Sequence, residues 1–342
     1  MKTSDIVIEA KNLSIGYANR HKQEVVHSQL DFCLYRGELT CLLGANGAGK
    51  STLLRTLAGV QKPLRGELKL LGQPIQNYSE KERSRTIGIV LTDKTQAGGL
   101  TVRELVALGR QPHTGFFGRL NLKDNEIIDY ALDAVGIAHK ASKYTAELSD
   151  GERQKVMIAK ALVQECPLIL LDEPTAFLDV VSRIEIMHLL HQLAQKEQKA
   201  ILLSTHDIEQ ALVLADKLWL MTDANGLECG VTEDIILNNR MDTLFPEKDI
   251  RFDLTHGIYS PTVKGNHSLY LTADNETLRH WAQNALNRNG YLCHTPEKNT
   301  SSDNDSFFLH INENHILTLH RSNKSIEFNS FEALLDAIKE WE

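Results

Sequence analysis

The sequence lacks several features that would each indicate a different class of protein. No apolar run approaches the roughly 20 residues that a helix needs to cross a bilayer, and the start does not resemble a secretory signal. Positive charge is also scarce, because 37 Lys and Arg against 45 Asp and Glu give a formal net charge of −8. Nucleic-acid-binding proteins usually carry a basic excess, so we expect no nucleic-acid partner. Any membrane role would be exercised from the surface, through a partner.

Cysteine is sparse and scattered. No two of the five cysteines have the spacing of a metal site or a redox pair: Cys33, Cys41, Cys166, Cys229 and Cys293. Such an odd, dispersed set is typical of a reducing cytosol, where most cysteines serve as small buried side chains. We find no internal repeat either. At 342 residues with 42% hydrophobic side chains, the chain can bury one large core or two unequal ones.

Strands and helices are predicted to alternate through most of the chain. The strand-like stretches are residues 5–13, 37–44, 167–171 and 199–205. The helical patterns are residues 50–60, 121–141, 151–164 and 182–195. The apolar run 167–171 indicates a buried parallel strand, because both of its faces would be covered. This alternation predicts an α/β core.

The composition changes after about residue 245, where Asn, His and Ser become more frequent. We therefore place a domain boundary there, with domains at 1–244 and 245–342. One helical face is expected from Leu278, Trp281, Ala282, Ala285 and Leu286. Alternating apolar residues from Phe307 to Ile311 predict a strand, and Asn329 with Glu332 forms a capping-box pattern before a last helix. These patterns predict a small α+β domain.

The stretch GANGAGKST predicts a phosphate-binding loop, because it follows a predicted strand and opens a predicted helix. Its residues are Gly44, Ala45, Asn46, Gly47, Ala48, Gly49, Lys50, Ser51 and Thr52. The glycines let several backbone N–H groups turn toward one anion, and the helix adds its positive end. Lys50 would reach the β- and γ-phosphates, and the Ser51 hydroxyl would bind Mg²⁺. The loop therefore predicts a bound nucleotide with Mg²⁺, but alone it does not say whether the nucleotide is a switch, a substrate or fuel.

Two acids follow the buried strand in LILLDEPT. Asp172 at the strand end can hold Mg²⁺, and Glu173 can orient or deprotonate an attacking water. The apolar run before them and Pro174 after them favour a catalytic edge over a solvated turn. The pair therefore predicts hydrolysis in addition to binding.

A third motif, LSDGERQ, lies between the phosphate loop and the acids, and we call residues 148–154 the signature segment. Ser149 and the Gly151 N–H open a helix whose positive end can hold a phosphate. Alone, LSDG would be an ordinary helix cap. In this order of motifs the chain resembles the ATP-binding subunit of an ATP-binding-cassette (ABC) transporter. The resemblance implies that Ser149, Gly151 and Glu152 act across a homodimer that sandwiches two ATP molecules.

Other residues match that family in order. Tyr17 resembles an aromatic that stacks on adenine, although a strand-end aromatic is the alternative. Asp179, in FLD, resembles a loop residue that faces the other subunit, and His206, in STHD, resembles the switch histidine at the γ-phosphate. The resemblance implies catalytic roles for Lys50, Glu173 and His206. It also implies a P-loop cassette with a mixed-sheet core and a helical subdomain that carries the signature segment.

The chain departs from the family in two places. Thr92 stands where a glutamine that contacts Mg²⁺ is expected, and Asp93, Gln96 or an extra water remain open as substitutes. Asp150 replaces a glycine of the signature segment, and its charge would oppose a γ-phosphate, so we expect it to face outward. Neither change touches the residues expected at the phosphate, the metal or the water. We therefore predict an active ATPase.

Residues 108–124, LGRQPHTGFFGRLNLKD, resemble a segment of importers for iron-siderophores, haem and vitamin B12. A loop broken by Gly and Pro, with Phe116 and Phe117 exposed, can dock a partner's short helix. The alternative is that His113 and both phenylalanines pack the helical subdomain. The segment favours this importer class over transporters of sugars, amino acids or lipids.

The resemblance implies an ATP-hydrolysing subunit of a prokaryotic importer for an iron chelate, haem or cobalamin. It would be peripheral, at the cytoplasmic face of the inner membrane, bound to integral-membrane permease subunits and serving an extracytoplasmic binding protein indirectly. A soluble ATPase with another macromolecular client is the alternative. Residues 245–342 could sense cargo, stabilise the dimer or contact the permease. We expect surface roles, and no metal, for His280, His294, His310, His315 and His320. Only His315 and His320 are close in sequence, and five residues apart on one strand they would face opposite sides.

Overall fold

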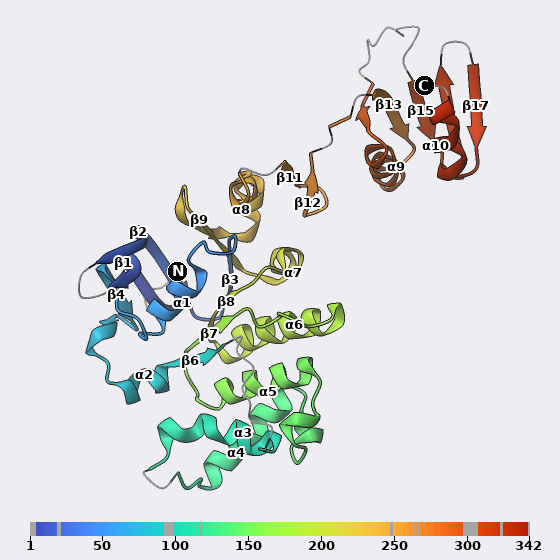
Figure 1. Ribbon diagram of the computed structural model, residues 1–342. Helices are drawn as coiled ribbons and strands as arrows, with labels where there is room; N and C mark the ends of the chain where they lie inside the picture. The colour runs from blue at the N-terminus through green and yellow to red at the C-terminus, as the bar shows by residue number, and fades with distance from the viewer. Residues whose placement is uncertain are drawn as a thin grey trace. The chain divides into compact units, whose positions relative to one another are not determined.

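The computed structural model describes residues 5–18, 22–91, 99–115, 118–246, 249–262, 264–265, 267–296, 307–321 and 324–340 (Figure 1). The chain divides into two compact units: residues 1–248 with 252–259, and residues 249–251 with 260–342. The division passes through the short strands β11 (Ile250–Asp253) and β12 (Ile258–Pro261). In the described residues, no helix combines the length and the apolar character needed to cross a membrane.

The first unit is built on a six-stranded sheet in the order β10-β9-β3-β8-β7-β6. Its strands are β3 (Leu39–Leu43), β6 (Ile87–Val90), β7 (Leu168–Asp172), β8 (Ala200–Ser204), β9 (Lys217–Thr222) and β10 (Gly226–Val231). All neighbours are parallel except β9 and β10. Strands β3 and β8 are buried throughout, as expected where helices or a second sheet cover both faces. The loops after β3, β7 and β8 therefore leave from one edge of the sheet.

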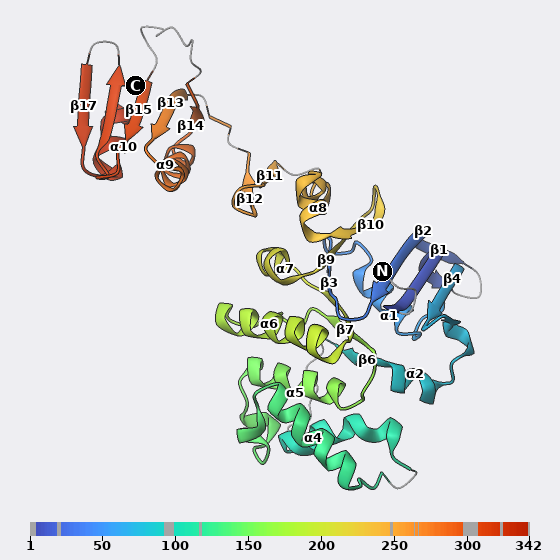
Figure 2. The same cartoon turned by 180° about the vertical axis from the view of Figure 1, so that it is seen from behind.

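A second, antiparallel sheet has the order β2-β1-β4-β5. Its strands are β1 (Ile6–Ala18), β2 (Gln23–Tyr35), β4 (Arg65–Leu70) and β5 (Gln73–Pro74) (Figure 2). One apolar cluster joins the inner side chains of this sheet, such as Leu13 and Leu34, to helix α1 (Lys50–Leu57) and to Trp219 of β9. Helix α1 is thus held between the two sheets, which fixes the loop before it.

The remaining part of the first unit is helical. It contains α2 (Glu80–Thr86), α3 (Val102–Ala107), a 3-10 helix η3 (Leu108–His113), α4 (Leu122–Ala134) and α5 (Asp150–Leu162). Helices α3, α4 and α5 lie together in both views, with α6 (Val180–Glu197) beside α5 (Figures 1 and 2). Helices α7 (Ile208–Leu214) and α8 (Thr232–Leu237) follow β8 and β10. The mixed α/β cassette with a helical subdomain is the fold that the sequence predicts.

The second unit is a five-stranded sheet with two helices. The strand order is β14-β13-β15-β16-β17, from β13 (His267–Ala273), β14 (Tyr291–His294), β15 (Phe307–Ile311), β16 (Leu317–Arg321) and β17 (Lys324–Phe328). Helix α9 (Glu276–Arg288) connects β13 to the parallel strand β14, and α10 (Phe331–Glu340) packs beside α9. Leu271, Leu286 and Leu319 belong to its own apolar core.

Three details of the second unit differ from the sequence prediction. Trp281 was expected on the buried face of α9 but is 61% exposed. Of the residues predicted for that face, only Ala282, Ala285 and Leu286 are buried. Helix α10 begins after Ser330, whose Oγ accepts the Ala333 N–H, so Asn329 is not its cap. His315 lies in the turn before β16 with a φ of 63°, so it does not share a strand with His320 and that prediction is wrong.

Candidate nucleotide site

The phosphate loop joins β3 to α1, and two of its glycines are required by the geometry. Gly49 has a φ of 96°, and a Cβ there would lie 2.7 Å from Val26 Cγ1. At Gly44 a Cβ would lie 2.6 Å from the Met221 carbonyl oxygen. No side chain caps the start of α1, so its leading N–H groups face the loop. This arrangement gives a helix N-terminus that is open to an anion.

Lys50 lies inside this loop with only 6% of its surface exposed. Its Nζ donates to the Gly44 oxygen at 2.7 Å and to the Ala45 oxygen at 3.1 Å. Burial lowers the pKa of the Lys50 ammonium, and the carboxylates of Glu173 and Asp172 oppose that shift. The cation is therefore held over the loop, where a bound phosphate would meet it.

The Ser204 hydroxyl hydrogen-bonds to both acidic residues that follow β7's apolar run, to the side chain of Asp172 and to the backbone of Glu173. Its Oγ donates to Asp172 Oδ1 at 2.6 Å and accepts the Glu173 N–H at 3.0 Å. The register explains this arrangement, because Asp172 lies opposite Ser204 on the parallel strand β8. Sequence reasoning missed Ser204, although its place at the end of the neighbouring strand was a usable signal.

Glu173 and His206 meet across the site. Glu173 Oε1 lies 2.8 Å from His206 Nε2, and Lys50 Nζ lies 3.5 Å from the same nitrogen. Glu173 has a φ of 48°, an uncommon conformation for a residue other than glycine, and it turns this carboxylate away from the direction of β7. Three expected catalytic side chains thus converge at one edge of the sheet.

The residues expected at the metal fit a divalent cation. Ser51 Oγ lies 3.4 Å from Asp172 Oδ1, so a hydroxyl and a carboxylate face one point beside the phosphate loop. Mg²⁺ prefers oxygen ligands of this kind and usually shares them with phosphate oxygens. The two residues also line an open cavity of about 210 Å³ between α1 and the strands β6 and β7.

Two residues from the antiparallel sheet contact the phosphate loop from outside. The Tyr17 hydroxyl lies 3.0 Å from Thr52 Oγ1, and the ring is 47% exposed beside the start of α1. The buried His27 donates from Nε2 to the Ala48 oxygen at 2.7 Å and supports the loop from below. The sequence drew attention to Tyr17 but not to His27, which belongs to no motif.

The signature segment opens α5 with a complete capping box. The Glu152 N–H donates to Ser149 Oγ at 3.3 Å, and the Ser149 N–H donates to Glu152 Oε2 at 3.1 Å. Lys140 pairs with Glu152 and, with the Ser149 N–H, lowers the pKa of that carboxyl. Asp150 is exposed and accepts from Arg153 at 2.8 Å, and its expected position away from a γ-phosphate stays a prediction.

The loop after the acids reaches the start of α6. Asp179 caps that helix by accepting the Ser182 N–H at 2.9 Å, which lowers the pKa of the Asp179 carboxyl. A Cβ at Gly151 would lie 2.8 Å from Ser182 Oγ, so the signature segment and the Asp179 loop are neighbours. Thr92, Asp93 and Gln96 lie outside the described residues.

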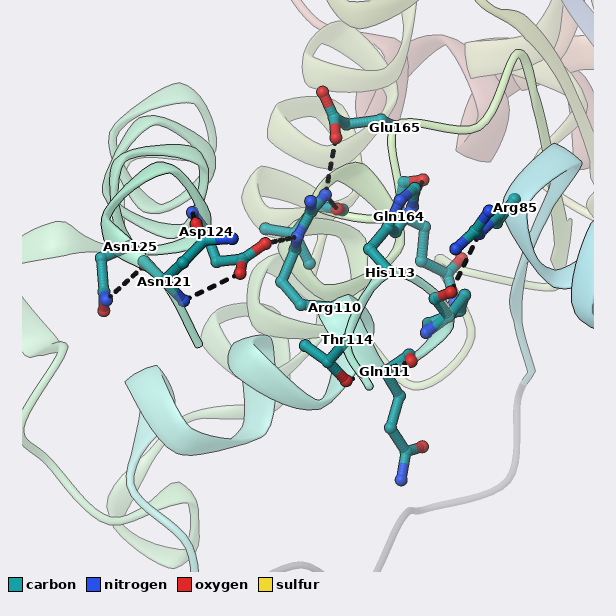
Figure 3. A network of polar contacts seen from close by, with 12 residues as sticks. Arg85, Arg110, Gln111, His113, Thr114, Asn121, Asp124, Asn125, Gln164 and Glu165 are labelled. Atoms are coloured by element: carbon teal, nitrogen blue, oxygen red, sulfur yellow. Dashed lines mark hydrogen bonds and ion pairs between the residues drawn. The ribbon is translucent and has the colours of Figure 1, made fainter. Parts of the chain in front are cut away.

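Within the segment GRQPH, Arg110 is buried and His113 half-buried, whereas the Gln111 side chain is exposed and points away from them (Figure 3). His113 donates from Nε2 to the Gln164 oxygen at 2.9 Å and is half-buried, which favours packing over docking for this residue. Arg85 donates to the Pro112 oxygen at 2.9 Å. Phe116 and Phe117, the residues expected to be exposed, lie outside the described residues.

Two family models match the chain: ABC transporter over residues 27–176, and Iron ABC transporter C-terminal domain over residues 266–339. An uncharacterized ABC transporter ATP-binding protein of Methanocaldococcus jannaschii is 38% identical, over 74% of this chain and 86% of its own length. The chain belongs to the ABC transporter ATP-binding proteins. It is the ATP-binding subunit of a transporter and an ATPase, and cassettes of this family work in pairs with membrane permease subunits.

Other relatives carry more specific names. The ferric enterobactin transport ATP-binding protein FepC of Escherichia coli is 35% identical, over 70% of this chain and 86% of the relative. The iron(3+)-hydroxamate import ATP-binding protein FhuC of Bacillus subtilis is 39% identical, over 60% of this chain and 74% of the relative.

Solved structures of cassettes show the same fold. The cbiO1 subunit of the Clostridium perfringens ABC transporter complex cbiONQ has a TM-score of 0.61 and 30% identity, over 70% of this chain and 95% of that one. The cassette MJ0796, a dimer in a post-hydrolysis state bound to ADP and Pi, has a TM-score of 0.57 and 25% identity. That match covers 66% of this chain and 98% of that one.

Proposed function

We propose that this ABC transporter subunit hydrolyses ATP to energise the import of an iron chelate through a separate permease. The observation that carries the cargo class is the iron-transporter C-terminal match at residues 266–339, beside relatives named for ferric enterobactin and iron-hydroxamate transport. Haem and cobalamin remain within the same importer class as alternatives. The relatives reported above give no support to a soluble ATPase with a non-transport client.

At the site, Lys50 and the N–H groups of the phosphate loop hold the β- and γ-phosphates of ATP. Ser51 and Asp172 would hold Mg²⁺, which supplies positive charge against the transferring phosphoryl group. Tyr17 lies where it can cover the adenine face, because its ring is exposed beside Thr52.

Glu173 accepts a proton from the attacking water, and His206 orients the γ-phosphate and that water. The two side chains lie side by side, with Glu173 Oε1 2.8 Å from His206 Nε2. Both can therefore contact one water at the γ-phosphate, Glu173 as the proton acceptor and His206 as the group that orients the water.

Two copies of the chain would close on two ATP molecules. Ser149 and Gly151 of one copy would meet the γ-phosphate held by Lys50 of the other, and Asp179 would face across the interface. ATP drives this closure because it binds the closed pair better than the open one. We place the pair at the cytoplasmic face of the prokaryotic inner membrane, on permease subunits supplied by an extracytoplasmic binding protein.

The variant Glu173→Gln tests the chemical part. It keeps the side-chain size and removes the base, so hydrolysis should fall about 100-fold or more while ATP binding persists and an ATP-bound dimer accumulates. Unchanged steady-state phosphate release would exclude Glu173 as the base.

The cargo is tested in cells that lack the chain's gene. These cells should lose the uptake of radiolabelled ferric siderophore. The wild-type chain should restore that uptake and Glu173→Gln should not. Uptake of labelled cobalamin and haem is measured in parallel. Loss of cobalamin or haem uptake alone would overturn the iron-chelate proposal. Normal uptake of all three would overturn the importer.

A further inference from the structure

Arg110 of the GRQPH segment is buried, with 4% of its surface exposed, and its guanidinium joins three elements (Figure 3). Its Nε donates to Asp124 Oδ1 at 2.9 Å. Its Nη1 donates to the Val163 oxygen at 2.6 Å and to Glu165 Oε2 at 2.7 Å. A buried guanidinium is costly unless its donors are satisfied, so this network holds its members in one arrangement.

The partners of Arg110 lie at opposite kinds of helix ends. Val163 is the C-cap of α5, where a cation is favourable against the helix dipole. Asp124 lies in the first turn of α4 and accepts the Asn121 N–H in a capping box, which lowers the pKa of its carboxyl together with Arg110. One side chain therefore ties the end of α5 to the beginning of α4.

The neighbours of Arg110 reinforce this tie. A Cβ at Gly109 would lie 2.2 Å from the Lys160 oxygen, so the backbone of η3 rests directly on the last turn of α5. His113 bonds the Gln164 oxygen just beyond that helix. The segment for which the sequence left partner docking and packing open thus contacts the C-terminal end of α5 at Arg110 and His113.

Helix α5 carries the signature segment at its other end. Its direction is set by its last turn, where Arg110 acts, and by its packing on α3 and α4. We propose that Arg110 is a positioning residue that aims Ser149 and Gly151 at the nucleotide bound by a second copy of the chain. This inference rests on the proposed two-copy ATP site. A lysine cannot reproduce the role fully, because its donors share one nitrogen, whereas Arg110 donates to Asp124 from Nε and to Val163 and Glu165 from Nη1.

The test compares Arg110→Met with Arg103→Met in a Glu173→Gln background. Arg103 is a matched control, because it also pairs with an acid of helix α4, Asp129, but that pair is partly exposed, with 37% and 59% of the two side chains accessible. We would measure the affinity of the single chain for a fluorescent ATP analogue and the ATP-dependent dimerisation constant by analytical ultracentrifugation. The nucleotide affinity and the dimerisation constant are both measured at a temperature at which circular dichroism shows that every variant is folded.

We expect Arg110→Met to keep its nucleotide affinity and to weaken ATP-dependent dimerisation about tenfold or more, since small misplacements of a binding group are costly. Arg110→Lys should recover part of the loss, and Arg103→Met should match the parent. When Arg110→Met is introduced into the chain that retains Glu173, kcat for ATP hydrolysis should fall while the KM for ATP stays near the wild-type value. Asp124→Asn, which keeps the Arg110 bonds to Val163 and Glu165, should show a smaller loss and replaces Arg110→Met if that variant does not fold.

Two results separate the possible failures. If Arg110→Met or Asp124→Asn loses only thermal stability and dimerises as the Arg103→Met control does, the positioning role is overturned. If the parent and the control both fail to dimerise with ATP, the proposed two-copy site is wrong, and the inference falls with it.

Discussion

Helices α1 and α5 both begin at a phosphate motif, but their first turns are satisfied in different ways. The start of α1 follows Gly49 and has no side-chain cap. The start of α5 follows Ser149, whose hydroxyl already accepts the Glu152 N–H. A phosphate can therefore enter the first site of a single chain directly, whereas at the second it must compete with an existing cap. We infer that the phosphate loop binds alone and the signature segment contributes only within a dimer.

The largest effect is expected at the start of α1, which no side chain caps. In Lys50→Met the buried cation over the loop is lost, and ATP affinity should fall about 100-fold, the scale of a lost charge-assisted hydrogen bond. Lys11→Met is the control, because that ammonium pairs with Glu9 on the surface of β1. Isothermal titration of each folded variant with ATP measures the difference. Equal affinities for the two variants would contradict the placement of Lys50.

A smaller effect is expected at the start of α5, which the Ser149 side chain caps. Ser149→Ala should leave ATP binding by the single chain unchanged and lower hydrolysis about tenfold through one lost hydroxyl–phosphate bond. Ser79→Ala is a close control, because Ser79 and Glu82 form the same capping box at α2. Both variants should lose about 1 kcal/mol of stability. An equal loss of hydrolysis in both would show that Ser149 acts only as a helix cap.

The smallest effect concerns pH. The Glu152 carboxyl has a lowered pKa in the folded chain, first through Lys140 and then through the Ser149 N–H. Its stabilising contribution is therefore complete above the unfolded pKa and is lost as pH falls through the lower, folded pKa. Glu152→Gln should be less stable than wild type by under about 1 kcal/mol at pH 7. Urea unfolding down the acid range should show that difference disappear; a constant difference would exclude the ionised carboxylate as its source.

The phosphate loop, the two acids and His206 could be placed from sequence because each follows a buried parallel strand. Since such strands end at one edge of a sheet, motif order alone brought Lys50, Glu173 and His206 together. The position of His113 could not be predicted, because its partner, the Gln164 oxygen, is a backbone atom in the turn after α5, distant in sequence. Backbone acceptors leave no trace in residue patterns.

The second unit was harder to predict, because its strand pairing and side-chain exposure depend on how its helix packs on its sheet. Its apolar alternation identified β15, but the parallel pairing of β13 with β14 depends on α9 packing across the sheet. Exposure of Trp281 also depends on which face of α9 meets that sheet. Periodicity locates a face within about one residue but does not say how wide the covered stripe is.

The Ser204 hydroxyl has a consequence for how this ATPase can vary between lineages. One oxygen serves the expected metal ligand Asp172 and the backbone of the expected base Glu173. A replacement that removes this hydroxyl would therefore take one hydrogen bond from the expected metal ligand and one from the expected base. Changes in cation binding and in water activation are thus coupled at position 204.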